Sequence, residues 1–274
     1  MSLLFKTIEK SVCSIVIALC VFCAGDLKSA ELKSHKAHYT VNLADSAMPS
    51  QDVSDVEGEM SLELRQDCEG WTLEQLSDTI IYDNEGGAEN IRWGYTIWES
   101  NDGNTLRFNS FRKVDGELVE NIRGSAKRKV DGTGEISYVQ PEVMKLPIEK
   151  DVLFPVQYQL SLLKAAEAGE RLYVAKVFDG STTEGAFEMN TFIGGMHKAE
   201  QTLGGKDPIQ AHIPYWPLKI AVYGKNPEAF GPDYETRQEV FSNGVLKGYT
   251  IDYAPDFKIK GTLERLEFLA KQEC

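Results

Sequence analysis

Residues 91–103 read IRWGYTIWESNDG, and this stretch decides the fold class. Large apolar side chains occupy the odd positions from 91 to 97, while Arg92 and Thr96 lie between them. A period of two predicts a β-strand with one buried face. The stretch ends in Asp102-Gly103, a pair that suits the positive φ values of a tight hairpin turn. We therefore expect an antiparallel neighbour directly after this strand.

The same pattern extends in both directions along the chain. Apolar residues alternate with polar ones at 39–43 and at 60–64. Further turn sequences follow at regular spacing: Asn84-Glu85-Gly86-Gly87, Asp115-Gly116, Asp131-Gly132, Asp179-Gly180 and Asn243-Gly244. Counting the runs between them gives about fourteen strands.

One segment has helical periodicity. Apolar residues at 158, 162, 165 and 166 fall on one stripe, Pro155 precedes them and Gly169 follows. This pattern predicts a helix from about Val156 to Ala168. No linker, repeat or low-complexity tract divides the chain. We therefore expect residues 31–274 to form one all-β domain, in which the helix covers part of a curved sheet.

The first thirty residues have the features of a signal peptide. Lys6 and Lys10 precede the apolar run VCSIVIALCVFCA at 12–24, which is too short for a permanent membrane anchor. Small residues follow at 24–30, so we expect cleavage in that range and export of the mature chain. A buried N-terminal helix of a cytosolic protein is the alternative.

Charge and cysteine content narrow the possible functions. The chain carries 29 basic and 42 acidic residues, a net charge of −13, which weighs against nucleic acid and against anionic lipid surfaces. Cleavage removes three of the five cysteines and leaves Cys68 and Cys274. In an oxidising compartment we expect this pair to form a disulfide. Closing a loop of about 207 residues contributes at most roughly 5 kcal/mol. A redox-active pair is the alternative, but the C-x-x-C spacing is missing.

No catalytic or metal-binding motif emerges from the sequence. His35 and His38 fall on opposite faces of a predicted strand, and no zinc or calcium spacing is present. We interpret Glu99 and Asp102 as solvated acids at a hairpin tip. We interpret the basic run at 123–129, with Arg123, Lys127, Arg128 and Lys129, as a strand end that discourages edge pairing. We expect no enzyme activity, no cofactor and no metal.

Aromatic residues gather in the predicted strands. They include Trp71, Trp93, Tyr95, Trp98, Phe108, Phe111, Tyr215, Trp216 and Tyr223. Most simply, they fill the core of a large curved sheet. Alternatively, they line an apolar cleft in an incompletely closed barrel, where an acyl chain or a partner's side chains could bind.

Short motifs are spread along nearly the whole chain: HKAHYTVNL at 35–43, VEG at 56–58, CEGW at 68–71, WE at 98–99 with DG at 102–103, LFPVQ at 153–157, FDGS at 178–181, IG at 193–194, WP at 216–217 with Tyr223, PDYE at 232–235, NGV at 243–245, DY at 252–253 with Phe257, and Cys274. As an ordered set, these motifs resemble those of the EipB family, exported proteins of Gram-negative bacteria tied to cell envelope integrity. The family pattern tends to carry His after the FPxQ run, where this chain has Tyr158.

The resemblance implies a periplasmic protein with a spiral-like, open β-barrel stapled by a Cys68–Cys274 disulfide. It also implies a role in envelope maintenance without catalysis. Our leading hypothesis is that a cleft of the spiral binds an envelope partner protein, with Tyr215 and Trp216 on an exposed loop at 213–217. The alternative is a carrier of a lipid or lipoprotein in the barrel interior. We expect no nucleic acid partner, and no membrane-spanning segment after cleavage.

Overall fold

The computed structural model describes residues 31–44, 52–198, 213–224, 231–253 and 257–274, in which sixteen strands and one helix form. The predicted signal peptide lies outside these ranges. The elements in chain order are β1 (His35–Leu43), β2 (Val53–Gln66), β3 (Gly70–Asp83), β4 (Ala88–Ser100), β5 (Thr105–Val114), β6 (Glu117–Arg128), β7 (Gly134–Gln140), β8 (Met144–Ile148), β9 (Val152–Leu153), α1 (Pro155–Glu167), β10 (Leu172–Val177), β11 (Phe187–Ile193), β12 (His197–Lys198), β13 (Pro214–Tyr223), β14 (Tyr234–Phe241), β15 (Leu246–Tyr253) and β16 (Phe257–Phe268).

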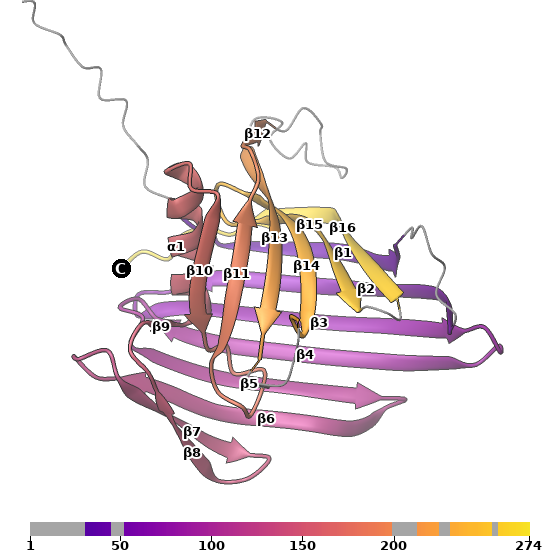
Figure 1. Cartoon of the computed structure of the whole chain (residues 1–274), viewed down its shortest axis with the longest axis horizontal. Helices are drawn as coiled ribbons and strands as arrows, with labels where there is room; N and C mark the ends of the chain where they lie inside the picture. The colour runs from indigo at the N-terminus through magenta and orange to yellow at the C-terminus, as the bar shows by residue number, and fades with distance from the viewer. Residues whose placement is uncertain (1–30, 45–51, 199–212, 225–230, 254–256) are drawn as a thin grey trace, which may run out of the picture.

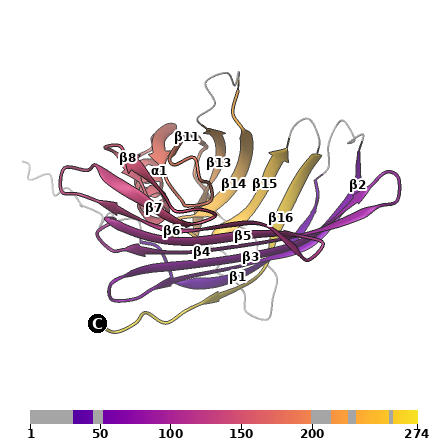
Figure 2. The same cartoon turned by 90° about the horizontal axis from the view of Figure 1, so that it is seen from below.

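The strands form one sheet that curls into a nearly closed barrel (Figures 1 and 2). From β1 to β8 each strand pairs with the next, and the return path runs from β9 to β16, which pairs antiparallel with β1. The two edges of the sheet, β8 and β9, are therefore consecutive in the chain. Pairing between the first and last strands, β1 and β16, joins the two halves of the sheet, and the open seam lies between β8 and β9. The prediction of an all-β, open-barrel fold is confirmed.

The predicted hairpin turns occur where the sequence places them. Asp115 and Gly116 join β5 to β6, and both have positive φ, 51° and 85°. Two consecutive positive φ values are the signature of a type I′ turn, whose twist matches that of the flanking strands.

Helix α1 begins and ends within one residue of the prediction. Pro155 occupies the first turn, where a missing N–H has no cost. Gly169 has φ 80°, and the amides of Gly169 and Glu170 donate to the carbonyls of Ala166 and Ala165. These two bonds make a Schellman motif, which satisfies carbonyls that the end of a helix leaves unpaired.

The core is concentrated at the α1 end of the barrel. Six residues of the helix are buried there against strands from both walls. Phe108, Phe154 and Phe178 anchor a second cluster, with edge-to-face ring contacts at 5.3 and 6.5 Å. Figure 1 shows α1 beside β10 at this end. The helix and these rings fill one end of the spiral, so the remaining space lies toward the other end.

Two predictions about local structure are wrong. The basic run at 123–129 is not a protective edge, because β6 lies between β5 and β7. Residues 214–217 are not an exposed loop but the first residues of β13, and only 5% of Trp216 is exposed. Pairing between β13 and β11 begins only at Leu218, opposite Ile193. Pro214 and Pro217 come before that point, so their missing N–H groups cost no hydrogen bond to β11.

Candidate functional site: the interior cleft of the barrel

The barrel interior holds an apolar cleft of about 620 Å³ between its two walls. The inward faces of β2–β5 supply one wall, and β11 and β13–β16 supply the other. Its apolar lining comprises Met60, Ile81, Ile91, Trp93, Met189, Val222, Tyr234, Leu246, Tyr249, Ile251, Tyr253, Phe257 and Ile259. Such a volume falls in the usual range for small-molecule sites, about 300–1,000 Å³.

A second pocket of about 280 Å³ continues the cleft toward the helix. Both pockets are lined by Met189, Tyr234, Gln238 and Leu246, so they adjoin one another. The inner pocket ends against α1, at Val156, Tyr158 and Gln159 among others. The space therefore runs lengthwise, from a mouth at the far end of the barrel to the buried face of the helix.

Aromatic side chains surround the mouth. Tyr234 and Tyr253 are 41% and 42% exposed, although both line the cleft. The rings of Tyr253 and Phe257 lie 5.3 Å apart, and Trp93 stacks on Tyr95 at 5.5 Å. A ligand that entered here would cover apolar surface that water now contacts, which is the condition for a hydrophobic driving force.

The cleft has a low-polarity interior. Burial raises the pKa values of the Tyr249 and Tyr95 hydroxyls. These phenols are therefore neutral over the physiological pH range. Burial likewise raises the pKa of the Asp179 carboxyl, which lines the inner pocket. Such an environment favours an uncharged, apolar ligand segment.

Several polar groups of the lining have partners within the protein. Gln75 and Tyr249 approach the Met60 sulfur at 3.0 and 3.6 Å, and the Thr236 hydroxyl donates to the Thr250 carbonyl at 3.1 Å. Among the described residues of the lining, the one cation is Arg112, at the rim, whose guanidinium lies 3.6 Å from Glu120. The rim can thus accept a polar head group while the interior remains apolar.

Glu99 corrects a prediction from the sequence. Instead of being solvated at a hairpin tip, it is 0% exposed and caps α1. Its two carboxylate oxygens accept the amides of Val156 and Gln157 at 2.7 and 3.1 Å. These are first-turn N–H groups without partners in the helix, and the helix dipole favours a negative charge there. Strand β4 thereby fixes the helix that closes the inner pocket.

Burial raises the pKa of Glu99 to about 7, although the two helix amides and nearby Arg128 act in the opposite direction. Arg128 belongs to the basic run, and its guanidinium lies 4.7 Å from the centre of the Phe154 ring, at the start of the helix. The side chain thus stabilises the helix end of the barrel by a cation–π contact. The sequence already contained a signal for Glu99, since it continues the inward-facing odd positions 91–97.

The predicted binding residues Tyr215 and Trp216 do not form a joint surface. Trp216 lies in the core cluster with α1, whereas Tyr215 is half-buried, stacked on His197 at 5.3 Å and next to Phe241. Neither lines the cleft.

The other aromatic residues divide between core and surface. Trp71, Tyr95 and Phe108 fill the core, and Trp93 lines the cleft. Trp98 lies under the Arg107 guanidinium at 5.0 Å. Tyr249 and Tyr253 also line the cleft but were not predicted as site residues, although both alternate with polar residues in the sequence.

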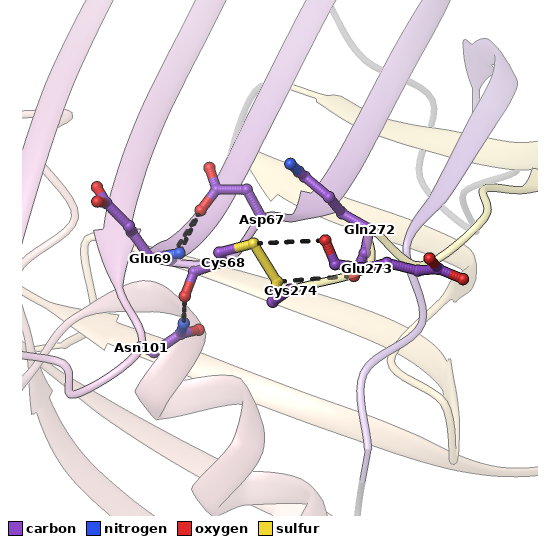
Figure 3. The surroundings of a disulfide bond; sticks show 8 residues. Asp67, Cys68, Glu69, Asn101, Gln272, Glu273 and Cys274 are labelled. Atoms are coloured by element: carbon purple, nitrogen blue, oxygen red, sulfur yellow. Dashed lines mark hydrogen bonds between the residues drawn. A yellow bond between two sulfur atoms is a disulfide. The ribbon is translucent and has the colours of Figure 1, made fainter.

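The Cys68–Cys274 disulfide is present, with a Cα–Cα distance of 5.6 Å (Figure 3). Cys68 lies in the turn between β2 and β3, and its carbonyl accepts the Asn101 side-chain amide at 3.0 Å. Both cysteines are exposed. The bridge therefore joins the C-terminal tail to the hairpin ends of β2–β4, away from the cleft.

Within the described ranges, no group of three or more His, Cys, Asp or Glu side chains could hold a metal ion. The single helix found there is too short to cross a membrane. Tyr158, which replaces the expected His, pairs its hydroxyl with that of Thr191 at 2.7 Å.

Comparison with known proteins gives consistent results. A family described as EipB-like matches residues 27–270. The cell envelope integrity protein EipB of Brucella abortus (strain 2308) is 28% identical over 253 residues, which cover 89% of this chain and 87% of that protein. A crystal structure of a beta-barrel-like protein of domain of unknown function DUF1849 from Brucella abortus superposes with a TM-score of 0.78 at 27% identity, covering 88% of this chain and 100% of that one. The barrel thus has the fold of that beta-barrel-like protein, and the chain belongs to the EipB-like family.

Proposed function

We propose that this protein is a periplasmic, non-enzymatic component of cell envelope maintenance that binds the acyl chain of a lipid or lipoprotein in its interior cleft. The observation that carries the proposal is the elongated apolar space of about 620 Å³ with partly exposed aromatic residues at its mouth. The periplasmic location is supported by the signal-like segment at 1–30 and by the disulfide, which persists in oxidising compartments.

The polarity of the cleft favours an acyl chain. Neutral phenols, aliphatic side chains and methionines line the interior, and Arg112, the single cation in the described lining, lies at the rim. An amphipathic molecule with a long apolar tail matches this distribution. Several lining hydroxyls and amides are already hydrogen-bonded within the protein, which favours binding over turnover.

A second candidate is a partner protein that inserts apolar side chains into the same cleft. The exposed rings of Tyr234 and Tyr253 favour it, because tyrosine is enriched in the central contacts of protein interfaces.

An acyl-chain titration separates the candidates. We expect a fluorescent fatty-acyl probe to bind the purified protein, and Ser77→Phe, which fills the cleft from β3, to weaken binding by roughly tenfold or more. Ser125→Phe is the matched control, since Ser125 lies on β6 outside the cleft. Native mass spectrometry of the protein from cells should also show a lipid-sized mass that is lost on denaturation. If the probe does not bind, or if both variants bind it equally, the carrier proposal fails and cross-linking to envelope proteins becomes the test.

A further inference from the structure

The outer face of β13–β16 brings together cations that are far apart in the sequence. In the sheet register, Lys219 lies opposite Arg237, Arg237 opposite Thr250, and Thr250 opposite Lys260. The three basic residues are exposed and point away from the barrel interior. With strands about 4.8 Å apart, they form a row of roughly 14 Å.

This row is part of a groove of about 940 Å³ whose charge is opposite to that of the chain. The groove is lined by five cations, completed by Arg171 and Lys247, and by one acid, Glu239. The whole chain, by contrast, has 29 basic and 42 acidic residues. Like charges directly opposite each other destabilise a sheet, so the pairing of Lys219 with Arg237 lowers the stability of the fold. Stability therefore does not account for these two cations.

Among the described residues, two of the three cations in the row, Arg237 and Lys260, have no internal counter-ion. Lys219 pairs with Glu235 at 2.9 Å, and Lys247 pairs with Glu239. Within the described ranges, no acid lies at ion-pair distance from Arg237 or Lys260. Their charges are therefore available to an external anion.

An exposed apolar cluster adjoins the cations. Phe192 lies opposite Lys219 on one side and opposite Leu172 on the other. Phe192, Leu172 and Val174 are 55%, 49% and 50% exposed. All three belong to the outward faces of β10 and β11. Apolar side chains beside unpaired cations are typical of surfaces that insert shallowly into a lipid interface while basic groups contact the head groups.

We propose that the outer face of β10–β16 docks on an anionic lipid surface. Phe192, Leu172 and Val174 enter the interface, and Arg237 and Lys260 contact lipid phosphates. The net charge of −13 does not prevent this, because charges more than about 8–10 Å from the membrane are largely screened at physiological salt. The outer face of β2 and β3, in contrast, has acids directly opposite one another, Glu59 with Asp78 and Glu63 with Glu74. An anionic membrane would repel that face, which favours docking through the basic groove.

Vesicle co-sedimentation tests the proposal independently of the cleft. The protein without its predicted signal peptide is mixed with vesicles of phosphatidylethanolamine and phosphatidylglycerol, or with neutral phosphatidylcholine vesicles. We expect binding to the anionic vesicles alone, and binding that weakens as salt is raised. The double variant Arg237→Glu/Lys260→Glu should weaken binding by roughly tenfold or more.

The matched control is Arg123→Glu/Lys127→Glu, which changes the net charge equally but lies on exposed positions of β6. It should leave binding unchanged. Phe192→Ala should also weaken binding, whereas Leu118→Ala, at an equally exposed site of 56%, should not. Failure of the unaltered protein to bind anionic vesicles, or equal loss in both double variants, would overturn the proposal. Salt-sensitive binding to polyglutamate without vesicle binding would instead identify the groove as a docking site for an acidic protein. None of these outcomes depends on acyl-chain binding.

Discussion

At the scale of single residues, Glu99 has the clearest consequence for stability. Its pKa rises from an ordinary 4.5 to about 7 in the folded protein, mainly through burial. The folded state therefore holds this proton more tightly than the unfolded state does. The resulting stabilisation is complete below about pH 4.5 and is lost as the pH rises through about 7. A shift of this size corresponds to about 3 kcal/mol in the free energy of unfolding.

Glu99→Gln removes the titration and keeps the shape of the side chain. We expect the unfolding free energy of the unaltered protein, relative to this variant, to fall between pH 5 and pH 7. The comparison is needed because His35 acts in the opposite direction: burial lowers its pKa, so its contribution is lost as the pH falls. Denaturant unfolding at several pH values measures the difference. Parallel pH profiles for the two proteins would show that Glu99 does not titrate in this range.

At the scale of elements, α1 closes the inner end of the cleft through its buried face. Leu163 is 2% exposed and belongs to the core cluster that joins the helix to both walls. Leu163→Ala should lower the free energy of unfolding by about 2–5 kcal/mol, because it removes buried methyl groups and leaves a cavity. Lys164→Ala, on the exposed side of the same turn, should change it by less than about 0.5 kcal/mol. Equal urea midpoints for the two variants would contradict this account of helix docking.

The elements also show how far sequence reasoning could go. Alternation and turn sequences predicted the strands and hairpins, because each of those signals is local. Glu99 was misjudged because a charged residue normally ends a buried run, and only the tertiary position of the helix start explains its burial. The 214–217 stretch was misjudged because proline normally interrupts strands. Here both prolines lie before Leu218, the first residue of β13 that pairs with β11.

At the scale of the whole molecule, the distribution of charge was not predictable from composition. The cations of the basic groove come from five different strands or loops between residues 171 and 260, and only the sheet register brings them side by side. The interior cleft likewise depends on how β2–β5 curve over β13–β16. The sequence could suggest an apolar cleft from aromatic content, but not which rings line it.

The disulfide stabilises the junction between the two halves of the barrel. The barrel depends on the pairing of β1 with β16, and the bridge connects the tail after β16 to the β2–β3 turn across 206 residues. Since a crosslink over a long loop chiefly restricts the unfolded chain, Cys68→Ser should lower the melting temperature by about 5 °C or more.

The same loss should occur in Cys274→Ser and in the unaltered protein under reductant, and the double variant should lose no more than either single one. Hydrogen exchange should accelerate first in β16, which leads directly into the bridged tail, and not in β5 or β6, which lie four or more strands from β1. A melting temperature indifferent to reductant would show that β1–β16 pairing holds the two halves of the sheet together without the bridge.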